Sequence, residues 1–414
     1  MERDKQLAQV FHYDLYGKRD EKYDFLLNNN LQTVPWRELE LTEPQYFFAT
    51  KDFSQKEEYE KGFSVKELFP VNSVGIVTAK DAVFVNIGKR ALLKNIRDNL
   101  DINPNENLIH TIDYRPFDKR YVYYDTKRIE RARENVMQHF FKGENMGFIT
   151  NRQIRTSHIA HSFITKCITD LHIMETANAC PYIFPLYLYL ETDKLFSGEP
   201  RKPNLNETIN DNFSQCIGLR FVAEPVETRL IASENETRLI ASENETRSIA
   251  SLQNDAFAPI DILDYIYAVL HSPAYRERYK EFLKIDFPRV PYPENAEQFW
   301  KLVELGGQLR RLHLMENVEI QEGMADFPIA GTNEVEKLQY ANNRLFINDT
   351  QYFDNVPPET WNLYIGGYQP AQKWLKDRKG RTLGYDDIVH YRKIIRVLSL
   401  TMDIQKQIDT INIM

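Results

Sequence analysis

The chain has 414 residues, of which 42% are hydrophobic and 27% charged, a balance typical of globular proteins and not of disordered or low-complexity chains. This length suggests two or three domains and is enough to bury a core without disulfides or metals. Because 60 acidic residues outnumber 52 Lys and Arg, the formal net charge is −8, and any nucleic-acid surface must be a local patch.

The cysteines and the N-terminus indicate the compartment. Three scattered cysteines without close spacing argue against a disulfide framework or a cysteine-based zinc site, and they fit a reducing cytoplasm. The N-terminus has no apolar signal region, and no apolar run approaches the roughly 20 residues that span a bilayer. We therefore expect a cytoplasmic protein with no membrane partner.

The first 110 residues are predicted to form an N-terminal lobe. Residues 8–16 partly alternate like a strand, and a helix-like stretch follows around 23–27. Residues 70–87 are typical of two short strands joined in a hairpin. Residues 88–100 have the pattern of an amphipathic helix, ended by an Asn- and Pro-rich run.

Residues 111–223 are predicted to be a β-rich domain. The pattern over 109–125 favours strands with a turn at Pro116, and 127–141 is predicted to be a helix. The strand-like segments that follow are 146–150, 162–174 and 181–190.

A nine-residue repeat fills residues 227–253 in three copies, two of them ETRLIASEN and the third ETRSIASLQ. Three short copies are too few for a solenoid, and Glu, Asn, Thr and Ser dominate, so we interpret 224–255 as a linker or exposed insert. A duplication without a selected role is the favoured interpretation. A length switch between lobes is the alternative.

Residues 256–414 are predicted to be mostly helical. Apolar residues recur at helical spacing from Pro259 to a break at Ser272-Pro273, and Pro370 suits the first turn of another helix. The other predicted elements are helices at 294–316 and 385–412, and strands within 335–353 and at 361–366. The predicted fold class is therefore mixed α and β (α+β), a β-rich part followed by a helical C-terminal part.

Motifs of catalysis are missing. The sequence contains no phosphate-binding GxxxxGK[ST] or GxGxxG loop, no HExxH, no CxxC and no GxSxG. The Gly-rich loop and Asn-Pro-Pro-aromatic tetrad of an S-adenosylmethionine-dependent amino-methyltransferase are also missing, so we expect no catalytic residue and no cofactor site in this chain. His158 and His161 could share a helical face, but without a third ligand a surface or core pair is favoured over a metal site.

A nuclease is one alternative. Asp113, Asp118 and the run Asp125-Thr126-Lys127 loosely match the acid…acid-x-Lys pattern of metal-dependent nucleases. That chemistry needs carboxylates to hold a divalent ion and a lysine near the attacked phosphate. The pattern is short, and hairpin and ion-pair roles for these residues are favoured.

Two segments are strongly basic. Residues 114–158 hold ten basic and five acidic residues interleaved with tyrosines, and residues 373–381 hold five basic residues and one acid. Arginine can grip phosphate or the guanine edge, which makes both segments candidates for a nucleic-acid surface. A solvated face is the alternative for each segment.

Several long strings resemble one family. They include HYDLYGKRDEKYDFL (12–26), YRPFDKRYVYYD (114–125), VMQHFFKGENMGFITNRQ (136–153) and IGGYQPAQKWLKDRKGRTLGYDDIVHY (365–391). Together they resemble the C-terminal target-recognition (specificity) part of type ISP restriction–modification enzymes and related adenine-specific DNA methyltransferases. The resemblance covers almost the whole chain in preserved order. In that family HYDLYGKR-like strings lie at the end of the methyltransferase core.

The resemblance implies recognition of double-stranded DNA that directs adenine-N6 methylation and cleavage by catalytic modules outside this chain. S-adenosylmethionine would then be bound by the missing methyltransferase part. A methyltransferase or translocase polypeptide acting in trans is a further possible partner, which the strand at 8–16 could bind by its unpaired edge.

The resemblance and the charge pattern together give a set of predicted DNA-facing residues. They are Arg115, Arg120, Tyr123, Lys127, Arg128, Arg131, Arg133, Arg152, Gln153, Arg155, Lys373, Lys376, Arg378, Lys379 and Arg381. Arg suits guanine and Gln suits adenine in the major groove. For Arg115 and Asp118, an ion pair within the domain that stabilises the turn is the favoured alternative.

Overall fold

A computed structural model describes residues 8–41, 43, 46–190, 201–224 and 256–413. The chain divides into two compact units, Met1–Lys56 and Glu57–Met414. None of the helices described is long and apolar enough to cross a membrane. The nine-residue repeats lie outside the described residues.

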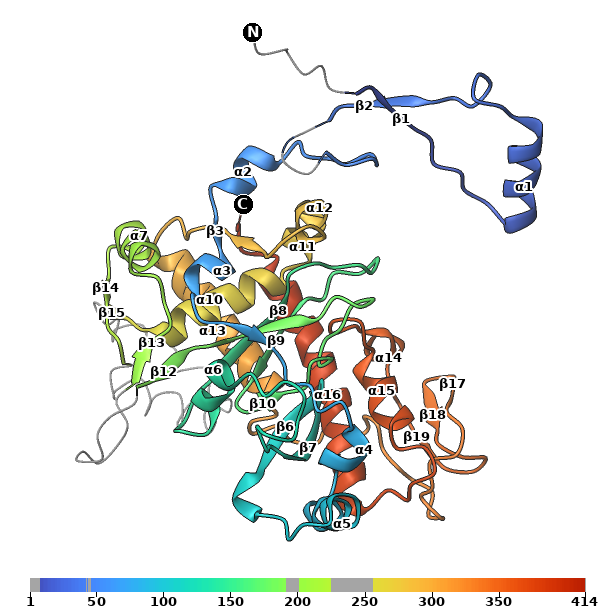
Figure 1. Cartoon of the computed structure of the whole chain (residues 1–414), viewed down its shortest axis with the longest axis vertical. Helices are drawn as coiled ribbons and strands as arrows, with labels where there is room; N and C mark the ends of the chain where they lie inside the picture. Colours follow the sequence, from blue (N-terminus) through green and yellow to red (C-terminus); the bar gives the residue numbers. More distant parts are fainter. Residues whose placement is uncertain (1–7, 42, 44–45, 191–200, 225–255, 414) are drawn as a thin grey trace. The chain divides into compact units, whose positions relative to one another are not determined.

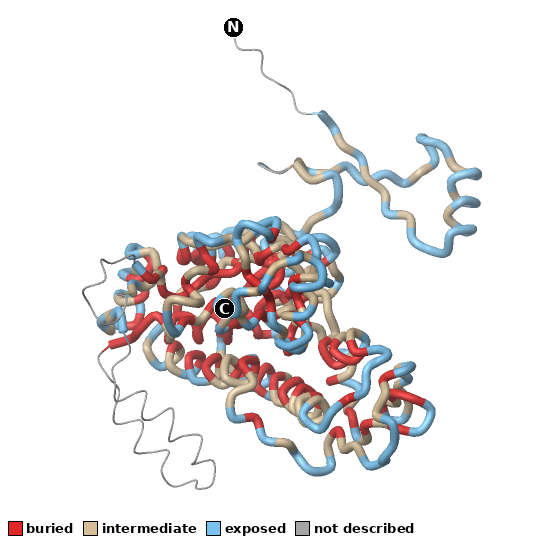
Figure 2. The backbone as a smooth tube through the Cα atoms, turned by 60° about the horizontal axis from the view of Figure 1, so that its bottom comes forward, coloured by how far each residue is buried: buried red, intermediate tan, exposed pale blue. Residues whose placement is uncertain are grey.

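The N-terminal unit is small, and the residues of it that the structure describes form no core. Strand β1 (Val10–His12) pairs antiparallel with β2 (Arg37–Leu39), and helix α1 (Arg19–Asn28) lies between them in the sequence, which confirms the strand and helix predicted there. The ring of Tyr13 stacks on that of Phe25. No described residue of this unit is buried, as the tan and pale-blue tube of Figure 2 shows.

Two helices form the centre of the large unit. Helices α10 (Pro259–His271) and α13 (Ala296–His313) pack against each other, and α10 is apolar on nearly all sides, as a fully buried helix must be. They cross closely at Gly306, where an added Cβ would lie 1.8 Å from the backbone oxygen of Asp264. The predicted helices and the break before Pro273 are confirmed, and α11 (Pro273–Arg278) and α12 (Lys280–Leu283) follow.

Two four-stranded sheets lie beside these helices (Figure 1). The first, here called the central sheet, has the order β4-β11-β8-β9 and is antiparallel throughout. Its strands are Ser73–Val74, Pro181–Pro185, Gly147–Asn151 and Ser162–Thr165. The second, the hairpin sheet, has the order β10-β6-β7-β5. Its strands are Ile168–Thr169, Ile109–Arg115, Asp118–Tyr123 and Val85–Asn86.

The hairpin β6–β7 turns at Pro116 and Phe117, as the sequence predicts, and Phe117 takes a left-handed backbone conformation with φ 62°. Helix α5 (Lys89–Leu100) also confirms its prediction and packs on β7 with Leu92 and Ile96 buried.

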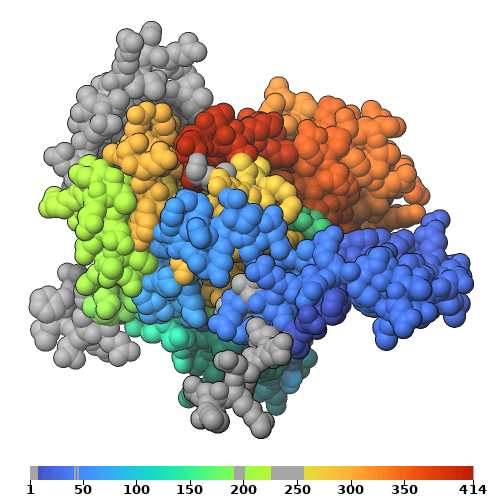
Figure 3. Space-filling view, turned by 90° about the horizontal axis from the view of Figure 1, so that it is seen from above, coloured from blue at the N-terminus to red at the C-terminus, as the bar shows by residue number. Residues whose placement is uncertain are grey.

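The remaining C-terminal elements share a second hydrophobic core with the hairpin sheet. Helices α14 (Pro358–Asn362) and α15 (Pro370–Lys376) pack on the long helix α16 (Tyr385–Ile408), with Trp374 and Tyr391 buried between them. A three-stranded sheet precedes them: β17 (Gln339–Ala341), β18 (Arg344–Phe346) and β19 (Tyr352–Phe353). Figure 3 shows this orange segment beside the red helix α16.

Short elements complete the large unit. Its helices are α2 (Lys56–Glu60), α3 (Val65–Leu68), α4 (Asp81–Phe84), α6 (Glu134–Met137) and α7 (Glu207–Ile217), with 3₁₀ turns at Glu106–Leu108 and Gln138–Phe140. The strand pairs are β3 (Phe63–Ser64) with β16 (Arg289–Val290), β12 (Tyr187–Tyr189) with β13 (Arg201–Pro203), and β14 (Arg220–Phe221) with β15 (Ala256–Phe257). The mixed α and β fold predicted from the sequence is confirmed.

Three local predictions are wrong. The helix predicted over 127–141 is reduced to α6 and one 3₁₀ turn, because the backbone of Arg131 exchanges two hydrogen bonds with Val77 and Arg133 is left-handed with φ 56°. Over 70–87 there is no hairpin, since β4 pairs with β11, β5 pairs with β7, and α4 lies between them. The strand predicted at 361–366 is replaced by the end of α14 and a turn.

Candidate nucleic-acid interface

The fold joins the two basic segments through one buried ion pair. Arg378 Nη2 lies 2.9 Å from Asp118 Oδ1, although the two residues are 260 positions apart. Arg378 is 4% exposed, donates from Nη1 to the backbone oxygen of Trp374, and has its guanidinium 3.5 Å from the centre of that indole ring. The turn of the β6–β7 hairpin is thereby fixed to the end of α15.

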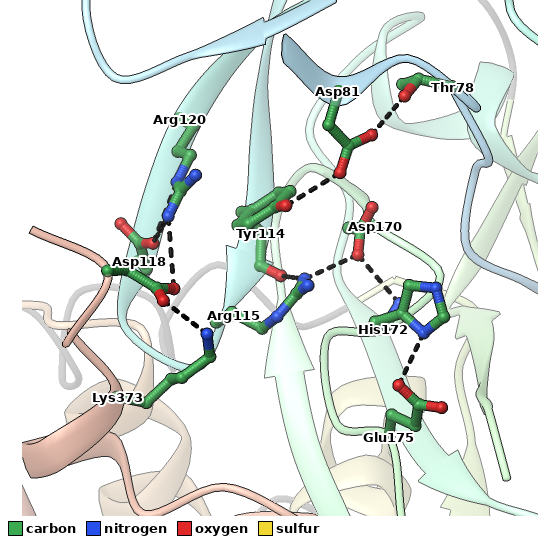
Figure 4. A network of polar contacts seen from close by, with 11 residues as sticks. Thr78, Asp81, Tyr114, Arg115, Asp118, Arg120, Asp170, His172, Glu175 and Lys373 are labelled. Carbon is green, nitrogen blue, oxygen red and sulfur yellow. Dashed lines mark hydrogen bonds and ion pairs between the residues drawn. The ribbon is translucent and has the colours of Figure 1, made fainter. Parts of the chain in front are cut away.

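A second arginine extends this ion pair into a network. Arg120 donates from Nε and Nη2 to Asp118 Oδ2 at 3.0 and 2.7 Å, and its Nη2 lies 3.4 Å from Asp377 Oδ2. Lys373 pairs with the other oxygen of Asp377 (Figure 4). Three cations thus alternate with two carboxylates, and most of the charge is satisfied inside the fold.

Arg115 belongs to a neighbouring network. Its Nη1 lies 2.6 Å from Asp170 Oδ1, and the two side chains are only 11% and 4% exposed. Burial raises the pKa of Asp170, and the guanidinium of Arg115 opposes this shift. Asp170 Oδ1 also accepts the backbone N–H of His172, whose ring pairs with Glu175 (Figure 4).

On the other side of Arg115, Tyr114 donates its hydroxyl to Asp81, and Thr78 donates to the same carboxylate. The ion pairs expected for Arg115 and Asp118 therefore exist, but with partners other than each other. Asp170, the partner of Arg115, and Asp377, which pairs with Arg120, are not among the predicted residues, because the tertiary fold brings them to these arginines.

The other predicted residues divide by exposure. Tyr123 is 2% exposed and its hydroxyl accepts the backbone N–H of Asn105, so it belongs to the core. Arg133 and Gln153 are half-buried. The exposed members are Lys127, Arg128, Arg131, Arg152, Arg155, Lys376, Lys379 and Arg381.

Three of the exposed arginines have ion-pair partners. Arg128 Nε lies 2.9 Å from Asp125. Arg131 Nε lies 3.5 Å from Glu130, and Arg152 Nε lies 2.9 Å from Asp286. Exposed pairs of this kind are weak, so these guanidinium groups can exchange a carboxylate for a phosphate at small cost.

The residues of the nuclease alternative are not brought together. Asp113 lies near the turn of the hairpin, opposite Lys119, whereas Asp125 follows the open end, where Ile109 pairs with Tyr123. Four residues of strand, about 13 Å, separate these positions. Asp113 is buried and accepts a hydrogen bond from Thr165, and burial raises its pKa. No group of three metal-ligating side chains occurs among the residues that the structure describes.

His158 and His161 do not form a metal site either. The His158 ring stacks on Tyr364 with 3.6 Å between centroids. His161 is fully buried, and burial holds its pKa well below the usual value.

With this geometry in view, comparison with known proteins identifies the family. A family model described as the Type ISP C-terminal specificity domain matches residues 98–407, three quarters of the chain and all of both basic segments. The chain belongs to this family. The resemblance found in the sequence is thereby confirmed.

Solved structures share the fold. The Type ISP restriction-modification enzyme LlaGI, as a nuclease-deletion mutant with a DNA substrate mimic, matches at TM-score 0.67 and 19% identity over 98% of this chain and 39% of that chain. The Type ISP enzyme LlaBIII bound to DNA matches at TM-score 0.65 and 16% identity, over 91% of this chain and 25% of that chain. DrdV in a DNA complex matches at TM-score 0.70 and 17% identity, over 97% of this chain and 43% of that chain.

The specificity-domain chain thus spans less than half the length of each of these proteins. No curated protein matches the sequence.

Proposed function

We propose that this specificity domain recognises a particular double-stranded DNA sequence and so directs adenine methylation and cleavage by catalytic modules that are not in this chain. The observation that carries the proposal is the junction of the two basic segments of a specificity-domain fold through Asp118 and Arg378. The DNA complexes of the three structurally similar enzymes support it.

The buried and the exposed cations have different parts in this proposal. Arg115, Arg120 and Arg378 hold the hairpin and α15 in place, so their role is positioning. The exposed cations contact phosphates and release counterions, which makes binding weaken steeply as salt rises. S-adenosylmethionine would be bound by the methyltransferase part, in the cytoplasm where the DNA lies.

The test is selection from a duplex pool with a randomised centre, using the purified chain at two salt concentrations. We expect one enriched sequence motif and an affinity that is much lower at the higher salt concentration. Binding without any enriched motif would overturn the proposal, because the proposal requires recognition of a particular DNA sequence.

The N-terminal unit favours a second role, docking onto a methyltransferase polypeptide. Its exposed apolar side chains include Leu27 at 83%, Tyr16 at 81% and Phe11 at 52% exposed. Apolar side chains exposed on a small unit whose described residues are not buried are candidates for contact with another protein. We expect the chain to co-purify with a separately expressed Type ISP methyltransferase polypeptide, and Leu27→Glu to weaken that association. Equal recovery of the variant would exclude this surface.

A further inference from the structure

Three loops meet at one end of the central sheet. The first, 152–161, joins β8 to β9, and the second, 170–180, leads into β11. Because Asn151 pairs with Pro181 and Thr150 pairs with Ser162, both loops leave the sheet from the same end, where Figure 1 shows them projecting side by side. The third loop, 363–369, joins α14 to α15. We call these the three-loop cluster.

Glycines allow the third loop to approach the other two. Gly366 donates its backbone N–H to the oxygen of Ala160 and has φ 59°. An added Cβ there would lie 2.6 Å from Met174, and one at Gly367 would lie 2.1 Å from the backbone oxygen of Glu175. Any larger residue would push the loops apart, so the Gly366-Gly367 pair specifies this contact.

Buried hydrogen bonds hold the cluster on the sheet. Asn151, which is 1% exposed, donates from Nδ2 to the backbone oxygens of Met174 and Ala179. Thr176 donates its hydroxyl to the backbone oxygen of Gln153. The second loop is also anchored at its start by the buried Arg115–Asp170 pair. Groups that discriminate between ligands need this kind of support from neighbouring residues.

Two side chains of the first loop, Gln153 and Arg155, carry planar hydrogen-bonding groups. Arg155 Nη2 donates to Gln153 Oε1 at 3.2 Å, so an amide and a guanidinium lie together on the first loop. The stacked His158–Tyr364 pair ties that loop to the third. By contrast, the loop after β7 presents Lys127, Arg128 and Arg131 among acidic neighbours, which offers charge and no amide.

We propose that the three-loop cluster reads base edges, with Gln153 and Arg155 as specificity-determining residues, and that Lys127, Arg128 and Arg131 contact phosphate. An amide fits the two major-groove groups of adenine, and a guanidinium fork fits those of guanine. This inference rests on the proposed function and divides its residues into two kinds.

The experiment is the same selection performed with Gln153→Ala/Arg155→Ala and with the matched control Lys127→Ala/Arg128→Ala. We expect the first variant to lose about 5- to 150-fold of base discrimination per contacted position. The control should keep the wild-type motif and bind all sequences more weakly. Wild-type discrimination at every position in the first variant would overturn the inference while leaving the proposed function intact. A wild-type chain without a motif would overturn both.

Arg155→Lys separates base reading from simple attraction. Lysine keeps the charge but lacks the planar fork, so discrimination should fall while the salt dependence stays unchanged. Unchanged discrimination would assign Arg155 to phosphate. Both side chains lie on a surface loop, and equal melting temperatures of all variants would verify that the fold is kept.

Discussion

The β6–β7 hairpin and the loop that follows it are both rich in arginine, yet their arginines have opposite surroundings. In the hairpin, Arg115 and Arg120 are largely buried, and the fold brings the distant carboxylates of Asp170 and Asp377 to them. In the loop, Arg128 and Arg131 are exposed and only loosely paired with acidic residues nearby in the sequence. The number of cations in a segment therefore does not reveal which can reach a ligand. Carboxylates brought in by the tertiary fold decide it.

The largest expected effect is the loss of stability when a buried ion pair of the hairpin is broken. Asp118→Ala would leave Arg378 buried without its carboxylate, and loss of one partner of a buried pair costs about 3–5 kcal/mol of unfolding free energy. Urea denaturation measures it. Glu130→Ala, which removes only the exposed partner of Arg131, is the control and should cost less than about 1 kcal/mol. Equal costs would erase the distinction between the two regions.

The next largest effect is the pH dependence of folding stability that the buried histidines cause. Burial, followed by the nearby charge of Arg276, lowers the pKa of His313 to about 3, and His271 and His161 shift the same way. The unfolded chain therefore takes up protons near pH 6.5 that the folded chain does not, and stability present above pH 6.5 is lost as pH falls.

The histidine contribution can be separated from that of other groups. Each histidine contributes at most about 1.4 kcal/mol per pH unit. Buried Asp113 and Asp170 have raised pKa values and act in the opposite sense at lower pH. Denaturation at pH 7 and pH 5 should therefore show a smaller loss for His313→Gln than for the wild type. An equal loss would mean that His313 titrates normally.

A third prediction concerns the exposed cations of the loop after β7. Replacing Lys127, Arg128 and Arg131 together by alanine should reduce the slope of log affinity against log salt by about 2–3, roughly 0.9 for each lost phosphate contact. The melting temperature should hardly change. Lys301→Ala/Lys406→Ala, which removes two exposed cations from α13 and α16, is the comparison and should leave most of the slope. If both variants lose the same slope per charge, attraction is not localised to this loop.

The smallest expected effect is that of Arg152→Ala on stability. Arg152 and Asp286 are 53% and 59% exposed, so the loss should stay below about 1 kcal/mol while DNA affinity falls. Thermal melting and anisotropy on the same sample would show it. A large drop in melting temperature would place Arg152 with the structural arginines.

Part of the fold and of the candidate site could be predicted from the sequence, and part could not. Helix α10 and the turn at Pro116 follow from local periodicity and backbone preference, and both are present. The helix predicted over 127–141 fails because Arg131 bonds to the distant backbone of Val77. Helix α14 had a local signal that was missed, since Pro358 lies in its first turn. The partners Asp170 and Asp377 had none, because sequence spacing does not encode contacts made over 55 or 257 residues.

The junction between the hairpin and α15 also has a consequence for synthesis on the ribosome. Asp118 emerges early, but Arg378 appears only when most of the chain has been made, and His390, which contacts the backbone oxygen of Phe117 in the same turn, comes later still. Until then the carboxylate lacks Arg378 and can pair only with Arg120, and the turn cannot settle into its final packing. Translation must therefore reach α16 before the surface proposed to read DNA is complete, so polypeptides released early would lack that surface.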